Sequence, residues 1–385
     1  MKNGWQTKKV SEIAEHSLGK MLDKAKNKGE LKPYLRNLNV RWFGFDLSDM
    51  LEMRFLPEEA ARYTAANGDV LICEGGYPGR AAIWEQDESI YFQKALHRVR
   101  FHEPLRNKWF LYYLHACDLN GTLKSHFNGA GIQHFTGEAL ARFEVPVPPL
   151  PEQKRIVRIL DEAFEAIATA KTNAEKNFQN ARALFESHLD SIFTQRGEQW
   201  VEKRLSDVCV FINGRAYKRD EMLDAGRYPL LRVGNFFTNR DWFYSDLELE
   251  PDKYCDTGDL LYAWSASFGP RIWDGGKVIY HYHIWKVLTN SAIVDKTFLL
   301  YLLKWDVEQI KQAHGTGTTM MHVSKGSMEN RVLPIPPLEQ QLRIVALLDH
   351  LAFESHRLES IYQQKLAALG ELKNSLLQEA FKGGL

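Results

Sequence analysis

The chain has 385 residues, of which 44% are hydrophobic and 25% are charged, as in an ordinary folded protein of about two or three domains. Its 49 basic and 49 acidic side chains give a net charge of +0, which argues against strong nonspecific DNA binding by the chain alone. Basic faces that are offset by acidic faces elsewhere remain compatible with this balance.

Membrane and secretion signals are missing from the sequence. No apolar run approaches the roughly 20 residues that span a bilayer, and Met1–Trp5 has no apolar core of a signal peptide. The four cysteines, Cys73, Cys117, Cys209 and Cys255, are far apart and form no Cys-x-x-Cys pair. We therefore expect a reduced, cytoplasmic protein that does not enter a membrane.

Residues 1–150 are predicted to form a mixed, strand-rich domain. Its strand candidates are short apolar runs bounded by turn residues, at 5–13, 33–40 and 68–73. Loops are expected at Glu74–Arg80 and Gly129–Gly131, where glycine or proline breaks the periodicity. An apolar helix is expected at Trp109–His115.

Residues 151–196 are predicted to form a long central helix. They contain no glycine, and no proline after Pro151. Apolar or small residues from Ile156 to Ile192 recur in alternating steps of four and three, which is typical of a coiled-coil seam. At about 1.5 Å per residue the helix would be roughly 65–70 Å long, so we expect it to act as a spacer or a docking element.

Residues 197–337 are predicted to form a second mixed domain that repeats the first with small shifts. Pro229–Arg232 corresponds to Pro33–Arg36, and Gly258–Leu261 corresponds to Gly68–Leu71. The segments between such matches differ in sequence. Two copies with one frame and unlike loops suit two sites that recognise different things.

The last segment, residues 338–385, repeats the long helix with a seam made mostly of leucine. The repeat is free of gaps here, because Pro148 and Pro336, and likewise Asp161 and Asp349, are 188 positions apart (336 − 148 = 349 − 161 = 188). A duplication of this extent predicts a pseudo-twofold internal repeat. Antiparallel pairing of the two helices would bury both seams and place one mixed domain at each end. The alternative is that each helix pairs with a different protein.

Taken in this order and twice over, these features resemble the specificity (S) subunit of type I restriction–modification enzymes. The resemblance is carried by the Pro-x-Pro-Pro-Leu-x-x-Gln runs Pro146–Gln153 and Pro334–Gln341, the Arg-Ile-Val that follows each run, and the end Gln378–Leu385. The strands that start at Gly68 and Gly258 are similar to those of that family's target-recognition domains. The resemblance implies an α+β fold with two target-recognition domains separated by two long antiparallel helices.

The resemblance also implies a division of labour. Such a chain is a non-catalytic subunit that recognises a split sequence in double-stranded DNA, with the helices setting the spacing of the half-sites. It docks two methyltransferase (M) subunits, which carry S-adenosylmethionine and methylate adenine, and through them the restriction (R) subunits. Mg and ATP are expected on those partner subunits, and no cofactor is expected in this chain.

The residues themselves favour a chain without catalysis. The sequence has no Asn-Pro-Pro-Tyr or Asp-Pro-Pro-Tyr run to hold a flipped adenine, and no Gly-x-x-x-x-Gly-Lys-Ser/Thr phosphate loop. Glu30-Leu31-Lys32 lacks the aspartate-bearing strand that a nuclease site needs. Two alternatives stay open. One is an enzyme, a methyltransferase or nuclease, with unrecognised motifs, and the other is a coiled-coil scaffold that does not bind DNA.

Base recognition requires Arg, Lys, Asn, Gln or hydroxyl side chains that loops deliver to a groove. The candidates for base contacts are Asn39, Arg41, Arg80, Gln133, Asn235, Ser267, Arg271, Thr318 and Thr319. The candidates for phosphate contacts are Arg36, Lys124, Arg232, Lys286 and Lys325, together with the loop glycines Gly129, Gly131, Gly315 and Gly317. The alternative for each is a solvated charge, a local hydrogen bond or a plain turn.

His281-Tyr282-His283 places two imidazoles on one strand face, where they could form a metal pair. A structural metal site needs more ligands than two, and no third one is visible nearby in the sequence. Packing or DNA contact is therefore the favoured interpretation, and no metal is expected.

Overall fold

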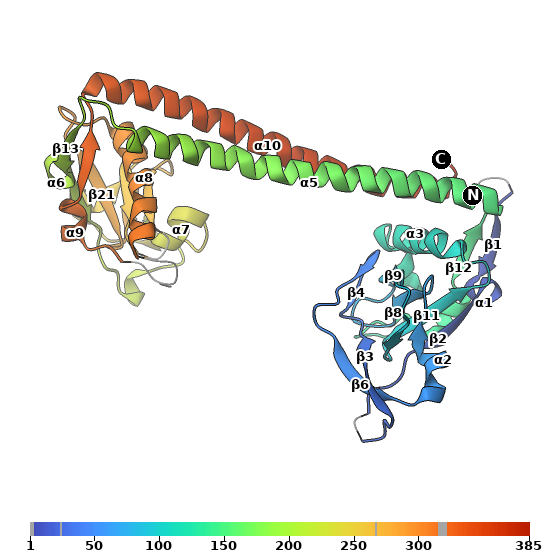
Figure 1. Cartoon of the computed structure of the whole chain (residues 1–385). Helices are drawn as coiled ribbons and strands as arrows, with labels where there is room; N and C mark the ends of the chain where they lie inside the picture. The colour runs from blue at the N-terminus through green and yellow to red at the C-terminus, as the bar shows by residue number, and fades with distance from the viewer. Residues whose placement is uncertain (1–3, 24, 266–267, 315–321) are drawn as a thin grey trace. The chain divides into compact units, whose positions relative to one another are not determined.

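The computed structural model describes residues 4–23, 25–265, 268–314 and 322–385, and its fold is mixed α+β (Figure 1). The chain divides into two compact units. Unit 1 is Met1–Glu175 with Gln364–Leu385, and unit 2 is Lys176–Gln363. Each unit combines one strand-rich domain with parts of both long helices. The predicted fold class is confirmed.

Unit 1 is built on two four-stranded sheets. Their strands are β2 Ala14–Leu18, β3 Glu30–Leu35, β6 Leu51–Phe55, β7 Thr64–Ala65, β8 Val70–Cys73, β9 Ala81–Ile83, β10 Ile90–Phe92 and β11 Leu96–Phe101. One sheet has the order β2-β11-β8-β9 with antiparallel neighbours. The other has the order β6-β3-β10-β7, in which β3 and β10 run parallel.

Smaller elements complete unit 1. They are β1 Gln6–Lys9, α1 Val10–Ile13, β4 Val40–Arg41, β5 Gly44–Phe45, α2 Ala60–Tyr63, α3 Arg106–Leu119, α4 Gly137–Arg142 and β12 Glu144–Val147. Strands β1 and β12 pair antiparallel, and β4 and β5 form a hairpin. The strand predicted at 5–13 therefore covers β1 and α1. The strand predicted at 33–40 ends at Leu35, where the chain enters a turn.

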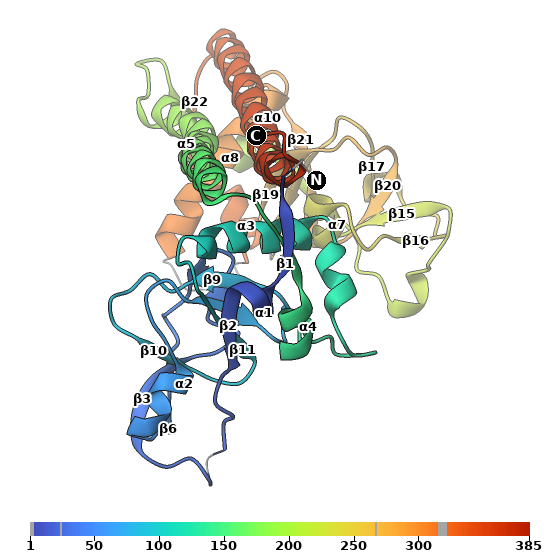
Figure 2. The ribbon, with the colours of Figure 1, turned by 90° about the vertical axis from the view of Figure 1, so that its right-hand side faces the viewer.

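Helix α3 covers the antiparallel sheet of unit 1 (Figure 2). Its Trp109, Phe110 and Leu114 are buried in one cluster with Val70 and Val99 of that sheet. The burial of each large apolar side chain stabilises the fold by roughly 1.5–3 kcal/mol, so α3 is the main cover of this core. The apolar helix predicted at Trp109–His115 corresponds to the middle of α3.

Unit 2 has the same plan. Its elements are β13 Val201–Arg204, α6 Leu205–Val208, β14 Cys209–Asn213, β15 Tyr228–Leu231, α7 Val233–Thr238, β16 Phe243–Ser245, β17 Tyr254–Cys255, β18 Leu260–Ala263, β19 Gly269–Ile272, β20 Val278–Tyr280, β21 Ile284–Thr289, α8 Lys296–His314, α9 Lys325–Glu329 and β22 Val332–Ile335. The sheet orders are β14-β21-β18-β19 and β16-β15-β20-β17, and β13 pairs with β22.

The two units thus share strand order, strand direction and the parallel pair at the centre of one sheet. They differ after that pair's first strand. Unit 1 continues into the β4–β5 hairpin, whereas unit 2 continues into helix α7. The predicted internal repeat is confirmed in the strand order, and this segment is one place where the two copies diverge in backbone structure.

Helix α5 spans Leu150–Thr194 and helix α10 spans Leu338–Lys382, each 45 residues long. In unit 1 the early part of α5 packs with the end of α10, since Lys373 lies over the ring of Phe164 at 4.7 Å. In unit 2 the late part of α5 packs with the early part of α10, where Ser355 donates to the carbonyl of Ala181 at 2.7 Å. Within each unit the two helices therefore run antiparallel. No helix in the described ranges is long and apolar enough to cross a membrane.

Candidate nucleic-acid interface

Each unit contains an Arg-x-x-Asn turn at the end of the parallel strand pair. In unit 1 the side-chain oxygen of Asn39 accepts the backbone N–H of Arg36 at 2.9 Å. In unit 2 that of Asn235 accepts the backbone N–H of Arg232 at 2.7 Å. The two asparagines are only 2% and 3% exposed. An asparagine in this position holds the turn closed, because its side chain replaces a backbone partner.

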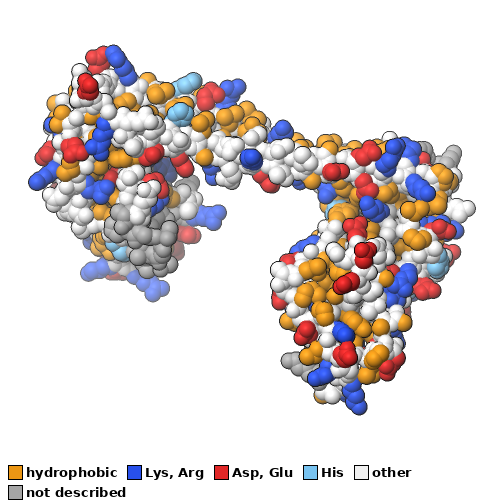
Figure 3. Space-filling view, viewed as in Figure 1, with side chains coloured by type: hydrophobic (Ala, Val, Ile, Leu, Met, Phe, Trp, Pro, Cys, Tyr) orange, Lys and Arg blue, Asp and Glu red, His pale blue; other side chains and the backbone are white. Residues whose placement is uncertain are grey.

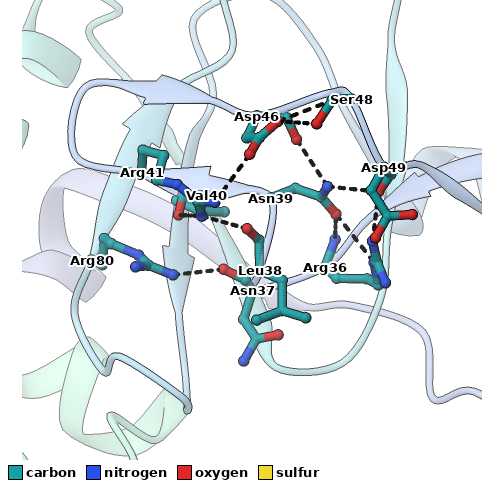
Figure 4. A network of polar contacts seen from close by, with 10 residues as sticks. All are labelled: Arg36, Asn37, Leu38, Asn39, Val40, Arg41, Asp46, Ser48, Asp49 and Arg80. Atoms are coloured by element: carbon teal, nitrogen blue, oxygen red, sulfur yellow. Dashed lines mark hydrogen bonds and ion pairs between the residues drawn. The ribbon is translucent and has the colours of Figure 1, made fainter. Parts of the chain in front are cut away.

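The side-chain amide of Asn39 makes its other hydrogen bonds to backbone carbonyls within the loop of unit 1 (Figure 4). Its amide donates to the carbonyls of Asp46 at 2.9 Å and Asp49 at 3.0 Å. Asn235 likewise donates to the carbonyl of Leu230 at 3.0 Å. Both asparagines are buried and bonded within the turn, so in this structure they shape the turn, and the base contacts predicted for them stay a prediction.

Arg36 is tied to the same loop. Its guanidinium donates to the carboxylate of Asp49 at 2.8 Å, and its side chain is only 13% exposed. Arg232 differs, because among the described residues it has no carboxylate partner and lies over the ring of Phe243 at 5.3 Å. Of these two phosphate candidates, Arg232 keeps the less neutralised charge.

Arg41 is the most exposed arginine of the unit 1 loop, with 51% of its side chain accessible. It lies on the β4–β5 hairpin, donates to the carbonyl of Leu38, and pairs with Asp46 at 3.1 Å (Figure 4). The pair is exposed and is therefore worth only about 0–1 kcal/mol, so Arg41 can exchange Asp46 for another acceptor at little cost.

Arg80 and Arg271 each donate a hydrogen bond to a backbone carbonyl of the segment that follows the parallel strand. Arg80 donates to the carbonyl of Asn37 at 2.9 Å, and its Nε is buried without a hydrogen-bond partner. Arg271 donates to the carbonyl of Phe236 at 2.7 Å and to Asp274 at 2.8 Å. The two arginines come from different positions in the repeat but both stabilise the segment that follows the parallel strand.

Lys286 is also engaged in the fold. Its ammonium contacts Asp259 at 2.7 Å and the carbonyl of Tyr254 at 3.3 Å. In unit 1 the matching Arg98 donates to the carbonyl of Thr64 at 2.6 Å, which is the equivalent strand. These bonds join the two sheets of each unit, so Lys286 stabilises the fold, and its predicted phosphate contact stays a prediction.

The glycine loop of unit 1 is a short hairpin closed by Asn128 and His134, whose backbones exchange hydrogen bonds at 2.8 and 2.9 Å. Gly129 has a φ of +114°, and a Cβ there would lie 2.2 Å from the carbonyl oxygen of Ile132, so only glycine fits. Gly131 and Gln133 are exposed on this hairpin. Lys124, on the preceding turn, is exposed as well.

The remaining candidates are in unit 2. Lys325 begins α9 and lies 3.6 Å from Glu329, one turn on. Five candidates lie outside the described residues: Ser267, Gly315, Gly317, Thr318 and Thr319. On the face in view, basic and acidic side chains are interspersed over both units rather than gathered into one basic stripe (Figure 3). This distribution agrees with the net charge of +0.

One cluster was only partly recognised in the sequence. The rings of His281, Tyr282 and His283 lie 4.0–4.8 Å apart, and Trp264 lies 4.9 Å from His283. Burial lowers the pKa of His281 to about 4 and also lowers that of His283. The described residues contain no group of three or more metal-ligating side chains. The sequence did not indicate that Trp264 belongs to this cluster, because Trp264 follows a strand that is not adjacent to the histidines in the sequence.

The chain matches, twice, a family model described as the type I restriction modification DNA specificity domain, over residues 2–176 and 197–365. Because these matches cover most of the chain, it belongs to the family of type I restriction–modification specificity subunits. Members of this family recognise DNA and are not the catalytic subunits of their complexes. The resemblance inferred from the proline runs is confirmed, and the enzyme alternative is not supported.

Individual relatives agree with this assignment. The MjaVIII specificity subunit of Methanocaldococcus jannaschii is 28% identical over 192 residues, which are 49% of this chain and 43% of that protein. The match thus spans less than half the length of that relative. The EcoKI specificity subunit of Escherichia coli is 21% identical over an alignment that covers 99% of this chain and 89% of the relative.

Solved structures share the fold. A chain from a study titled "Structural basis underlying complex assembly and conformational transition of the type I R-M system" has a TM-score of 0.82 at 19% identity, covering 100% of this chain and 99% of that one. The HsdS subunit of Thermoanaerobacter tengcongensis has a TM-score of 0.67 at 19% identity, covering 100% and 98%.

Proposed function

We propose that the chain recognises a bipartite DNA sequence, with one mixed domain for each half-site and the paired helices α5 and α10 fixing the distance between them. The observation that carries this proposal is the repeated Arg-x-x-Asn turn. It is closed by the same hydrogen bond in both units and leads into different structures, the β4–β5 hairpin and helix α7. Two recognition surfaces on one frame suit two different half-sites.

The division of the chain follows from this proposal. Residues 1–150 form target-recognition domain 1 and residues 197–337 form target-recognition domain 2. Residues 151–196 and 338–385 form the central and C-terminal spacer helices. The helices would serve both mixed domains, which agrees with the way each compact unit draws on parts of α5 and α10.

The proposed partners are two methyltransferase subunits, with restriction subunits bound through them. Helix α10 supports such docking, because Leu342 and Phe353, about three turns apart on one side of the helix, are large apolar side chains that remain 57% and 66% exposed. Exposed apolar side chains that share one face of a helix are suited to contact with a partner protein. S-adenosylmethionine, Mg and ATP belong to the partners in this proposal.

Mapping of methylated adenines in a host that carries this chain and its methyltransferase tests the proposal. We expect methylation at one sequence made of two short specified parts separated by a spacer of fixed length. A continuous target, or methylation that persists without this chain, contradicts the proposal. The second outcome would favour the scaffold alternative.

A domain exchange tests whether the halves are independent. Replacing residues 1–150 with another recognition domain should change one half of the methylated sequence and leave the other unchanged. If both halves change, the two domains do not recognise DNA independently.

A further inference from the structure

A tight turn joins the two sheets in each unit, and its backbone hydrogen bonds are the same in both. The last residue of the turn differs in conformation, because Ala95 has a φ of +88° whereas the equivalent His283 does not have a positive φ. In unit 1 the turn is Gln93–Ala95, between β10 and β11. The N–H of Gln93 donates to the carbonyl of Leu35 at 3.1 Å, and that of Leu96 donates to the carbonyl of Gln93 at 3.1 Å. The first bond attaches the turn to β3, the strand that leads into the Arg-x-x-Asn turn, and the second closes the turn.

In unit 2 the corresponding turn is His281–His283, between β20 and β21. The N–H of His281 donates to the carbonyl of Leu231 at 2.8 Å, and that of Ile284 donates to the carbonyl of His281 at 2.9 Å. The positions of Gln93, Lys94 and Ala95 in unit 1 are therefore those of His281, Tyr282 and His283 in unit 2.

A fourth position belongs to each turn. Glu74 follows β8 and donates its N–H to the carbonyl of Ala95 at 2.9 Å. Trp264 follows β18 and donates its N–H to the carbonyl of His283 at 3.1 Å. We call these four positions the turn patch: Glu74, Gln93, Lys94 and Ala95 in unit 1, and Trp264, His281, Tyr282 and His283 in unit 2.

The side chains of the turn patch differ completely between the units, although the backbone bonds are kept. Unit 1 presents a carboxylate, an amide and an exposed ammonium. Unit 2 presents two imidazoles and two aromatic rings, and Tyr282 is 38% exposed at its centre. The indole of Trp264 donates to the carbonyl of Tyr282 at 2.8 Å, which fixes the rings relative to the turn. Positions where the backbone hydrogen bonds are conserved and the side chains differ are suited to recognising different ligands, because the fold does not depend on those side chains.

The turn patch also adjoins the predicted recognition loops. In unit 1 the amide of Asn37, inside the Arg-x-x-Asn turn, donates to the carbonyl of Gly75 at 3.1 Å. The N–H of Phe135, at the end of the glycine hairpin, donates to the carbonyl of Glu74 at 2.7 Å. The turn patch therefore lies between the Arg-x-x-Asn turn and the glycine hairpin of the same unit.

We propose that the turn patch selects base pairs in the half-site that each unit recognises, an inference that rests on the proposed function. In unit 1, Lys94 and Gln93 offer donors for guanine or adenine edges, and Glu74 offers an acceptor for the amino group of cytosine. In unit 2, the imidazoles and the Tyr282 hydroxyl offer hydrogen bonds, and the rings offer apolar contact to the methyl group of thymine. The two units thereby prefer different sequences.

A reciprocal pair of substitutions tests the turn patch, read out by mapping methylated adenines with the full chain and its methyltransferase. Tyr282→Lys places the unit 1 side chain in unit 2, and Lys94→Tyr does the reverse. Each should lower methylation of the original sequence roughly 5- to 150-fold, as expected for a lost base contact of about 1–3 kcal/mol. Each should change one half of the sequence only, and the two variants should change opposite halves.

Tyr228→Lys is the matched control, because Tyr228 lies at the far end of β15 from the turn and contacts Glu248 at 3.3 Å. It should leave both halves unchanged. If Tyr282→Lys lowers the melting temperature, His281→Gln replaces it, since it introduces the residue that makes the equivalent backbone hydrogen bonds in unit 1. Ala95 is left intact because its φ is +88°, a strained value for a larger side chain.

The outcomes separate the two proposals. If the unmodified chain directs methylation to no split sequence, the proposed function fails. If it does, and a folded Tyr282→Lys or His281→Gln variant and a folded Lys94→Tyr variant all keep both halves, the turn patch is not a recognition element and the proposed function stands.

Discussion

Tyr112 on α3 donates its hydroxyl to a carboxylate oxygen of Asp161 on α5 at 2.6 Å. The repeat keeps this contact, since Tyr301 on α8 donates to Asp349 on α10 at 2.6 Å. Each bond lies within one unit and joins the cover helix of a mixed domain to a long helix. Burial raises the pKa of both tyrosines, so the hydroxyls stay protonated as donors at neutral pH.

We expect Tyr112→Phe and Tyr301→Phe each to lower the free energy of unfolding by about 1.5–3 kcal/mol, the range for a hydrogen bond to a charged group. Chemical denaturation measures this loss. A double-mutant cycle with Asp161→Ala or Asp349→Ala isolates the pair, because the tyrosine substitution should cost little once the acceptor oxygen is gone. Additive losses would show that the pairs do not interact.

The repeat in the sequence predicted much of this arrangement. Asp161 and Asp349 align without a gap, and the seams that place them follow from helical periodicity, a local property. The tyrosine partners were not predicted, because they lie 48 or 49 positions away and only the packing of α3 and α8 brings them close. Local periodicity determines the helices, whereas tertiary contact determines the pairs.

The candidate site was harder to predict for the same reason. Asn39 and Asn235 are of a type that contacts bases, yet both are buried by turns whose closure depends on the surrounding chain. Lys286 pairs with Asp259, which is 27 positions away. Composition and loop position identify residues that are able to contact DNA, but only the folded chain shows which of them already have partners.

Two residues of the unit 1 loop should separate stability from binding. Asn39→Ala should lower the free energy of unfolding by about 1–3 kcal/mol, because it leaves buried backbone groups without partners.

Arg41→Ala should leave the free energy of unfolding within about 0.5 kcal/mol of the unmodified chain, as for an exposed side chain. If Arg41 contacts phosphate, its loss should weaken DNA binding for all sequences and reduce the salt slope by about one. Binding by the assembled methyltransferase complex at several salt concentrations checks this. An unchanged slope would remove Arg41 from the interface.

The glutamines of the two proline runs should differ in importance. Gln341 donates to the carbonyls of Pro336 and Ile293 at 2.8 and 2.9 Å and accepts from the N–H of Asp295 at 2.8 Å. Gln153 donates to the carbonyl of Pro148 at 2.6 Å, and its side-chain oxygen is buried without a partner.

Gln341→Leu should therefore cost about 3 kcal/mol of unfolding free energy, and Gln153→Leu about 1 kcal/mol. Denaturation of both variants, compared with the half-buried neighbour variant Gln340→Leu, measures the difference. Equal losses for the two buried glutamines would mean that the additional bonds of Gln341 contribute no net stability.

His97 should make unit 1 sensitive to acid. Its ring nitrogen Nε2 lies 3.0 Å from the carbonyl of Phe135, and burial lowers its pKa to about 4. Between about pH 6.5 and pH 4 this histidine binds a proton in the unfolded chain, where its pKa is near 6.5, but stays neutral in the folded chain. Stability should therefore fall as the pH is lowered from about 6.5 to about 4, by on the order of 3 kcal/mol at the acid end.

His97→Gln keeps a donor for Phe135 and removes the titrating group, so it should flatten the fall in this pH range. His115, whose pKa burial also lowers to about 4, acts in the same direction and limits how flat the profile becomes. Denaturation at several pH values measures the slope. A slope that is identical with and without His97 would show that this histidine does not control it.

The spacer role of α5 and α10 is tested by lengthening both helices at once. Seven residues inserted after Glu175 and after Gln363, where the two compact units meet along the chain, keep the alternating four-and-three seam in register. The added length is about 10 Å, or roughly three base pairs of duplex. We expect the methylated sequence to keep both halves and to gain about three base pairs between them.

Insertion in one helix alone is the control, because it shifts one seam against the other by a full heptad and leaves unmatched length that must bulge or buckle. It should reduce methylation without producing a new, uniformly longer spacer. A double insertion that folds and still methylates at the original spacing would mean that the helices do not set the distance, since a rigid pair cannot grow by about 10 Å and leave the half-sites where they were.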